Sequence, residues 1–200
     1  MSARLLSARP EIVAPRLLGS VLTSDVGGER VSVRLTEVEA YGGAGEDPGS
    51  HAFRGPTPRN ATMFGPAGHA YIYFTYGMHW CANVVTGPSG SASAVLIRAG
   101  EVVEGVEIAR RRRPTARTDR DLARGPARLT VALGITGELD GVDMLDDSSP
   151  LRLVIARRAQ SALIVGPRTG VAGRGAATPW RFATDHPTVS PYRPASRRTS

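Results

Sequence analysis

The residues best suited to chemistry in this sequence are two carboxylates, Glu37 and Glu39, in the run Thr36–Tyr41. The run has the character of a β-strand, on which residues two apart point the same way and lie about 6.6 Å apart. That separation falls within the roughly 6.5–9.5 Å between the two carboxyl groups of inverting glycosidases. Two glutamates on an exposed strand face would give the same pattern, so residue type alone leaves both interpretations open.

Three of the five tyrosines, Tyr71, Tyr73 and Tyr76, follow in a second predicted strand and its turn. Tyr71 and Tyr73 share one face of that strand, which ordinary core packing would also explain. Tyr76 precedes a glycine at the strand end, where an aromatic side chain is often exposed and can insert between bases. With Tyr41, these residues could form a stacking platform for a flat base, worth about 1–3 kcal/mol per base.

The remaining polar side chains give weaker indications. None of the four histidines pairs with a carboxylate at helical spacing, so no metal site is predicted. The acidic run Asp140–Asp147 could bind magnesium but is more typical of a solvated turn. Arg110–Arg113 is either a phosphate-binding patch or a solvated helix end, where cations suit the helix dipole. Arg98 ends an apolar strand, which predicts a buried ion pair with a carboxylate across the sheet.

The composition limits the class of protein. The 200 residues, 41% of them hydrophobic, suit a single domain with a substantial core. All 25 basic residues are arginine and the net charge is +7, which favours phosphate-rich partners. Without lysine, no side chain can form a Schiff base, and Cys81 alone cannot build a disulfide or a thiolate cluster. No signal peptide or membrane span is recognised, so we expect a cytoplasmic protein.

Hydrophobic patterning predicts that strands carry most of the candidate residues. Strands are expected at 19–24, 30–41, 70–76, 81–86, 92–99, 151–157, 163–165 and 180–183, and helices at 10–18, 101–113 and 126–133. Within 30–41 the apolar face becomes a carboxylate face, which indicates a cavity. The long Gly/Pro-rich connection 42–69 is expected to be functional. Residues 1–9 and about 186–200 are expected to be flexible tails.

Several runs of the sequence, in order and at matching spacing over about residues 10–190, carry a family resemblance. They are Thr36-Glu37-Val38-Glu39-Ala40-Tyr41, Ser50-His51-Ala52-Phe53-Arg54-Gly55, Thr57-Pro58-Arg59-Asn60-Ala61-Thr62-Met63-Phe64, Ala70–Met78, Cys81-Ala82-Asn83-Val84-Val85, Val95-Leu96-Ile97-Arg98-Ala99 and Gly125-Pro126-Ala127-Arg128-Leu129. Together they resemble the alkyladenine (3-methyladenine) DNA glycosylase family. Because several independent motifs agree, the resemblance is far more specific to this family than a single Glu-Ala-Tyr motif would be.

The resemblance implies a mixed α/β (α+β) fold, a single domain on a curved antiparallel β-sheet with flanking helices. It also implies catalytic roles for two residues, with Glu39 activating the hydrolytic water and Arg98 helping to hold it. Tyr41, His51 and Tyr73 would line the pocket that receives the extruded base.

Further residues matched to the family would read the base and hold the DNA. Asn83 would lie at the pocket wall, where its amide opposes the exocyclic amine of a normal guanine. Tyr76 would enter the minor groove and fill the gap left by the base, with Arg59 and Met78 as additional DNA contacts. The resemblance is poorer near the C-terminus, where Ala183 occupies a position that is often aromatic in the family.

The implied activity is excision of alkylated or deaminated purines from double-stranded DNA. The nucleotide must leave the stack to expose its glycosidic bond, and a carboxylate can stabilise the oxocarbenium-like sugar while taking a proton from water. An N3-alkylated purine is cationic and is attracted to aromatic faces. Without lysine the enzyme would be monofunctional. It would need no metal or other cofactor and would act as a monomer at the bacterial nucleoid, with salt-dependent binding.

Two other functions remain open at the level of sequence. A non-catalytic, basic nucleic-acid-binding domain of the same fold would bind DNA and release no base. A nuclease that uses the acidic run Asp140–Asp147 would cleave strands and lose that activity to a chelator.

Overall fold

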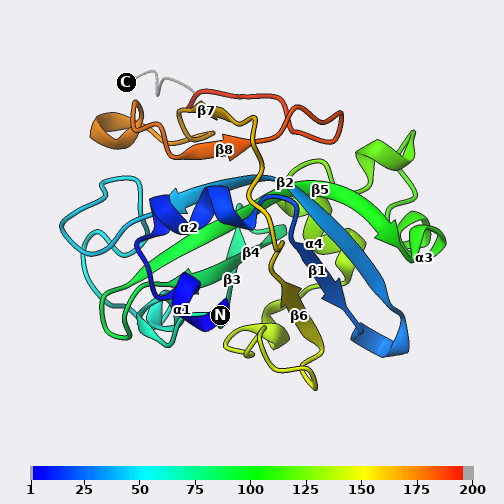
Figure 1. Cartoon of the computed structure of the whole chain (residues 1–200), viewed down its shortest axis with the longest axis horizontal. Coiled ribbons are helices and arrows are strands. Elements are labelled where there is room, and N and C mark those ends of the chain that lie inside the picture. The colour runs from blue at the N-terminus through cyan, green and yellow to red at the C-terminus, as the bar shows by residue number, and fades with distance from the viewer. Residues whose placement is uncertain (1, 196–200) are drawn as a thin grey trace.

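The framework of the protein, a computed structural model that describes residues 2–195, is one eight-stranded antiparallel sheet flanked by helices (Figure 1). The strands are β1 (Val21–Ser24), β2 (Val31–Tyr41), β3 (Ala70–Thr75), β4 (His79–Thr86), β5 (Ser93–Glu104), β6 (Leu151–Val154), β7 (Ile164–Gly166) and β8 (Arg181–Ala183). Their order is β3-β4-β5-β2-β1-β6, with β8 paired to β2 and β7 to β8. The predicted mixed α/β single domain is confirmed, and every predicted strand is present with shifted ends.

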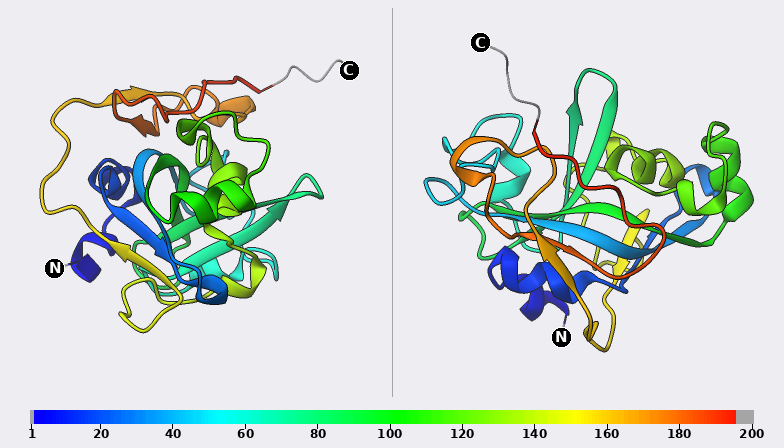
Figure 2. Two further views of the ribbon diagram at one scale, coloured as in Figure 1. Left: turned by 90° about the vertical axis from the view of Figure 1, so that its right-hand side faces the viewer. Right: turned by 90° about the horizontal axis from the view of Figure 1, so that it is seen from above.

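The helices lie on both faces of the sheet. They are α1 (Ser2–Leu6), α2 (Pro10–Leu17), α3 (Val106–Arg112) and α4 (Pro126–Leu133). Figure 2 shows α1 and α2 on one face and α3 and α4 on the other. Val13 and Leu17 of α2, and Leu129 and Leu133 of α4, are fully buried in the core. The sheet is therefore covered on both faces, which leaves β2 and β5 buried along most of their length.

Strand β2 is the central strand of the sheet and carries the candidate acids. It pairs with β5 along its length, while its other neighbour changes from β1 to β8 near Glu37. The pairing with β5 is irregular between Leu35 and Val38, and such bulges redirect side chains next to functional sites. Glu37, within this irregular stretch, and Glu39, just after it, both reach the side chain of Arg98 on β5.

One predicted helix is wrong in its first part. Residues up to Glu104 continue β5, with Val102 paired to Val33, and α3 begins only at Val106. The change of direction occurs at Gly105, which has a φ of +73° and where a Cβ would lie 2.1 Å from the carbonyl oxygen of Arg30. Only glycine fits this combination of positive φ and close approach. The helix predicted at 126–133 is confirmed as α4, with Gly134 as its left-handed C-cap.

Both chain ends are packed more closely than the predicted flexible tails at 1–9 and about 186–200. Leu6 of α1 is fully buried in the core. Near the other end, Thr188 is 2% exposed and its hydroxyl forms a 2.9 Å hydrogen bond with Thr36 of β2. A few buried side chains thus hold segments whose composition is polar and basic. Residue 1 and residues 196–200 of the predicted tails lie outside the described residues.

Among residues 2–195, no helix is long and apolar enough to cross a membrane. The connection 42–69 contains only a short 3-10 turn (Ala61–Phe64) between β2 and β3.

Candidate active site

A cavity of about 340 Å³ lies at one end of the central strands, between the connection 42–69 and the loop that follows β7. Its volume is in the range of small-molecule sites. Six predicted site residues line it, namely Tyr41, His51, Tyr73, Tyr76, Asn83 and Arg98. The cavity is thus lined by residues of strands β2, β3, β4 and β5, by the first residue of α4 and by two loops.

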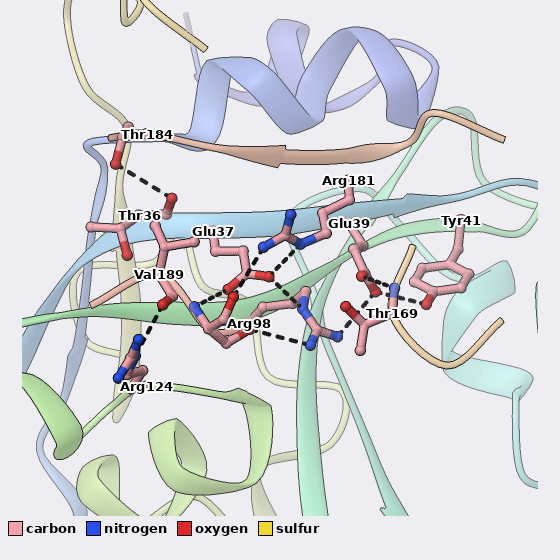
Figure 3. Close-up of polar contacts among 11 residues, drawn as sticks. Thr36, Glu37, Glu39, Tyr41, Arg98, Arg124, Thr169, Arg181, Thr184 and Val189 are labelled. Carbon is pink, nitrogen blue, oxygen red and sulfur yellow. Dashed lines mark hydrogen bonds and ion pairs between the residues drawn. The ribbon is translucent and has the colours of Figure 1, made fainter. Parts of the chain in front are cut away.

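Glu39 is fully buried just behind the residues that form the floor of this cavity. Its Oε2 accepts hydrogen bonds from the Tyr41 hydroxyl at 2.9 Å and from Arg98 Nη1 at 3.2 Å (Figure 3). Its Oε1 accepts a 2.7 Å bond from the backbone N–H of Thr169. Tyr41, Arg98 and Thr169 all line the cavity, so the carboxylate lies directly behind the residues that form the floor.

Glu37 lies deeper and anchors the arginines. Its Oε1 accepts bonds from Arg98 Nε at 2.9 Å and Arg181 Nε at 2.7 Å, and its Oε2 accepts a 2.7 Å bond from the Ser190 N–H. Burial opposes ionisation, but the charge of Arg98, the bonds from Ser190 and the charge of Arg181 outweigh it and lower the pKa of Glu37. Glu37 therefore remains a carboxylate and holds Arg98 from the side opposite the cavity.

The predicted burial and pairing of Arg98 is confirmed. Its side chain is 7% exposed and forms ion pairs with two fully buried carboxylates, Glu37 and Glu39. Burial opposes its charge, but Glu39 and Glu37 outweigh that effect and raise the pKa of the guanidinium. A buried ion network of this kind is stable only when each member keeps its partners.

An aromatic wall rises from this floor. The His51 ring meets the Tyr73 ring edge-on, with centroids 4.6 Å apart, and His51 Nδ1 lies 3.3 Å from the Tyr71 hydroxyl. Burial, with a smaller contribution from Arg59, lowers the pKa of His51, so the imidazole is neutral at pH 7. Burial raises the pKa of Tyr71 to about 12 and that of Tyr73 further, so both phenols stay protonated. The wall presents uncharged aromatic surface.

Strand β4 contributes two more residues to the cavity. Asn83 is buried and donates a 2.9 Å hydrogen bond from Nδ2 to the carbonyl of Tyr71, which fixes the plane of its amide. Cys81 pairs across the ladder with Tyr73 and also lines the cavity. Burial raises the pKa of the Cys81 thiol.

The β3–β4 hairpin carries two of the three predicted DNA-contacting residues, Tyr76 and Met78. Tyr76 is 86% exposed and Met78 66% exposed, and the Tyr76 backbone has a φ of 52°, which is rare for a bulky residue. Tyr76 also borders the cavity. Arg59 donates a 2.7 Å bond to the carbonyl of Phe74 and lies 5.9 Å from the centre of the Tyr73 ring. Arg59 thus links the connection 42–69 to the hairpin.

Sequence patterns did not reveal an ion pair beside the cavity, formed by Asp47 and Arg168. Arg168 is fully buried and forms a bidentate ion pair with Asp47, in which Nη2 lies 2.7 Å from Oδ1. Its guanidinium also lies 4.6 Å from the centre of the Tyr41 ring and 5.4 Å from that of Trp180. The ion pair joins two loops that pack against Tyr41, and it places Thr169, the next residue, against Glu39.

The acidic run Asp140–Asp147 does not form a site. Asp140 accepts bonds from the Ile72 N–H and the Thr62 hydroxyl, and Asp146 accepts from Ser148. Over residues 2–195, no group of three or more His, Cys, Asp or Glu side chains could hold a metal ion. These aspartates cap turns and a strand, as expected for a solvated turn region.

Buried carboxylates behind an aromatic cavity are consistent with the class of DNA glycosylases, enzymes that act on a base taken out of the DNA stack. The sequence matches the family described as Methylpurine-DNA glycosylase (MPG) over residues 4–188, and the chain belongs to this family. It is a DNA-3-methyladenine glycosylase of base excision repair.

Similar curated proteins come from several bacteria and share the name "Putative 3-methyladenine DNA glycosylase". The protein from Streptomyces avermitilis is 54% identical, over 96% of this chain and 93% of the relative. That from Nocardia farcinica is 52% identical, over 98% and 93%, and that from Leifsonia xyli is 56% identical, over 92% and 89%.

Proposed function

We propose that this glycosylase extrudes alkylated and deaminated purines from duplex DNA and hydrolyses the N-glycosidic bond with a water that Glu39 activates. It acts as a monofunctional enzyme and as a monomer, without a metal or organic cofactor. Because the relatives are bacterial, its place of action is the nucleoid. The cavity receives the base. At its floor a water molecule is held, and the carboxylate of Glu39 supplies the negative charge.

The hydrogen-bonding state of Glu39 is the observation that best supports this role. A carboxylate oxygen can accept two hydrogen bonds. Within residues 2–195, Oε2 already accepts two, from Tyr41 and Arg98, whereas Oε1 accepts one, from the Thr169 N–H. The free acceptor position of Oε1 can therefore take the proton of a water molecule as it attacks the sugar.

The hydroxyl of Thr169 supports the same placement of the water. Its Oγ1 is buried without a hydrogen-bond partner among the described residues, and Thr169 lines the cavity. Buried polar atoms are normally satisfied by protein or by ordered water. A single water that bridges Thr169 Oγ1 and Glu39 Oε1 would satisfy both atoms, and it would stand at the floor of the cavity with a fixed orientation.

The aromatic wall selects the leaving group. A purine alkylated at N3 is cationic, and the faces of Tyr41 and Tyr73 attract such a ring by cation–π interaction. It departs as a neutral base and needs little acid assistance. Neutral deaminated bases require hydrogen bonding, for which neutral His51 offers one N–H. The fixed amide of Asn83 opposes the exocyclic amine of guanine, which discriminates against the normal base.

The decisive experiment is Glu39→Gln, assayed for base release from a duplex with a single 3-methyladenine or hypoxanthine. Loss of general-base catalysis should lower release by about 100-fold or more, while duplex binding is retained. Glu101→Gln, on the partly exposed Glu101 that pairs with Arg34, is the matched control and should leave release unchanged. Near wild-type release by Glu39→Gln would remove Glu39 from this role.

The same assay separates the alternatives. A non-catalytic binding domain would bind the duplex and release no base from any lesion. A nuclease would cut the strand and stop with a chelator, whereas the proposed enzyme leaves an intact abasic strand and is indifferent to chelation.

A further inference from the structure

Arg181 is a second arginine buried beside the two glutamates, and it has no part in the reaction as proposed so far. It is the first residue of β8, and in the pairing of β8 with β2 it lies opposite Glu39. Residues that face each other in an antiparallel pair place their side chains on the same face of the sheet. The Arg181 side chain therefore lies on the same side as Glu39 and Glu37 (Figure 3).

The guanidinium of Arg181 binds Glu37 and the chain that follows β8. Its Nε donates a 2.7 Å hydrogen bond to Oε1 of Glu37, the same oxygen that accepts from Nε of Arg98 at 2.9 Å. Its Nη2 donates a 3.1 Å bond to the carbonyl oxygen of Ser190, whose own N–H donates to Oε2 of Glu37. Arg181 and Ser190 together thus hold both oxygens of Glu37.

The four charged side chains at this position form a balanced, buried group. Glu37 and Glu39 are fully buried, and the side chains of Arg98 and Arg181 are 7% and 8% exposed. Without Arg181, the single charge of Arg98 would serve both carboxylates. Two buried carboxylates that share too little positive charge take up a proton. A proton on Glu39 would remove the base, and a proton on Glu37 would weaken its hold on Arg98.

The other groups that face the two glutamates supply no cation. Tyr41 donates its hydroxyl to Glu39, and burial raises the pKa of this phenol and of the Cys81 thiol, so both stay neutral. Ser190 and Thr169 contribute uncharged N–H groups. Within residues 2–195, Arg181 is thus the only cation besides Arg98 that forms an ion pair with either glutamate.

Arg181 has no direct route to the substrate. Among the described residues 2–195, neither Arg181 nor Glu37 lines the cavity, whereas Arg98 does. Arg181 is hydrogen-bonded to Glu37, which is bonded in turn to Arg98. Arg98 completes the path with its bond to Glu39. A change at Arg181 can therefore alter Glu39 without any contact with the base.

We propose that Arg181 is a positioning residue for base excision, which neutralises Glu37 so that Arg98 remains available to Glu39. Its contribution is a buried positive charge, with no contact to DNA or to the extruded base. The proposal rests on the proposed function, because it takes Glu39 as the group that activates the water.

The test is the pH profile of base release by Arg181→Gln, measured in single turnover with saturating protein on a duplex that contains one hypoxanthine. The two carboxylates should hold an extra proton at low pH and lose it as the pH rises. Relative to the wild type, release should fall by about 10-fold or more near pH 6 and recover towards about pH 9. An equal fractional loss at every pH is the result of a purely structural role and would overturn the proposal.

A compensating change sharpens this test. Arg181→Gln combined with Glu37→Gln removes one charge of each sign and leaves Arg98 and Glu39 as a balanced pair. The new amide oxygen can still accept the bond from Arg98. The double variant should release base faster than Arg181→Gln near pH 6, with the pH dependence of the wild type. If it releases base no faster than the single variant, neutralisation of Glu37 is not the role of Arg181.

Two further variants control for charge and for folding. Arg124 also holds the chain after β8, through a 3.0 Å bond to the carbonyl of Val189, but within residues 2–195 its ion pair is with Asp121. Arg124→Gln should therefore keep the wild-type pH profile. Arg181→Lys retains the positive charge and should also keep that profile, even with a lower melting temperature. A displaced profile for Arg181→Lys would overturn the proposal, and this variant carries the test if Arg181→Gln does not fold.

Glu39→Gln separates this proposal from the proposed function. If Glu39→Gln releases base at the wild-type rate, the proposed function is wrong whatever Arg181→Gln does. If Glu39→Gln abolishes release while Arg181→Gln loses the same fraction at every pH, only the role of Arg181 is wrong. Binding of Arg181→Gln to a duplex with a stable abasic-site analogue should match that of the wild type, and a selective loss of this binding would assign Arg181 to DNA contact instead.

Discussion

In most proteins charged side chains are exposed and large apolar side chains are buried. The floor of the cavity and the tip of the β3–β4 hairpin both show the opposite arrangement. At the floor, Glu37, Glu39 and Arg98 are buried and connected by charge-assisted hydrogen bonds. At the tip, Tyr76 and Met78 are exposed to solvent on a tight turn. Buried charges need a complete set of partners, whereas exposed apolar groups contribute little to folding. The floor should therefore combine stability with chemistry, and the tip should serve binding alone.

The sharpest test of this contrast is Arg98→Met at the floor. It leaves the buried carboxylates of Glu37 and Glu39 without their shared cation, and breaking a buried ion pair costs about 3–5 kcal/mol. We expect the free energy of unfolding, measured by urea denaturation, to fall by that amount, and base release to fall with it. A loss below about 1 kcal/mol would show that the floor does not depend on complete pairing.

Tyr76→Gly tests the other side of the comparison. We expect binding to a damaged duplex to weaken by about 1–3 kcal/mol, since stacking on an aromatic side chain is lost. The free energy of unfolding should stay the same or rise, because glycine accepts the positive φ at this position without strain. Binding isotherms and urea denaturation of the same preparation measure both effects. A loss of unfolding free energy similar to that of Arg98→Met would contradict the expectation that the hairpin tip serves binding alone.

Thr169→Val sharpens the account of the floor itself. The substitution keeps the backbone N–H that binds Glu39 and removes the hydroxyl proposed to orient the water. A lost hydrogen bond of about 1 kcal/mol corresponds to a rate several-fold lower. Thr169→Ser restores the hydroxyl and should recover release in single-turnover assays. Equal rates for the valine and serine variants would contradict a water at this position.

The smallest predicted effect is the change in the free energy of unfolding with pH, which is negligible near pH 7. The pKa values of Glu37 and Asp47 are lowered in the folded protein, so both groups stabilise it fully above their ordinary pKa values of 4.5 and 3.8. That contribution is lost as the pH falls from there through the lowered values. Urea denaturation below pH 5 should show this loss in the wild type and in Tyr76→Gly alike. If the free energy of unfolding does not change below pH 5 in either protein, the carboxylates of Glu37 and Asp47 do not stabilise the fold as predicted.

The elements that hold the site were largely predictable, because local patterns specify them. The alternation of apolar residues predicted strand β2. A proline at the start and a glycine at the end predicted the bounds of α4. The position of Arg98 after an apolar run predicted its ion pair with a carboxylate. The first part of the predicted helix at 101–113 failed because valines suit a strand as well as a helix, and the position of Gly105 decided between them.

The contacts that complete the site could not be predicted, because they join loops far apart in the chain. Asp47 and Arg168 are separated by 121 positions, and the bond from Ser190 to Glu37 spans 153. Neither loop has a periodicity that would fix its path. A single aspartate and a single arginine have many candidate partners in a sequence with 25 arginines.

The buried thiol of Cys81 has a consequence for an enzyme that works where alkylating agents are present. Such electrophiles attack thiolates far faster than thiols, and burial holds the pKa of the only cysteine above its ordinary value. Without lysine, the chain also lacks the next most reactive side-chain amine. We therefore expect Cys81 to react slowly with the alkylating agents that create the substrates of this enzyme.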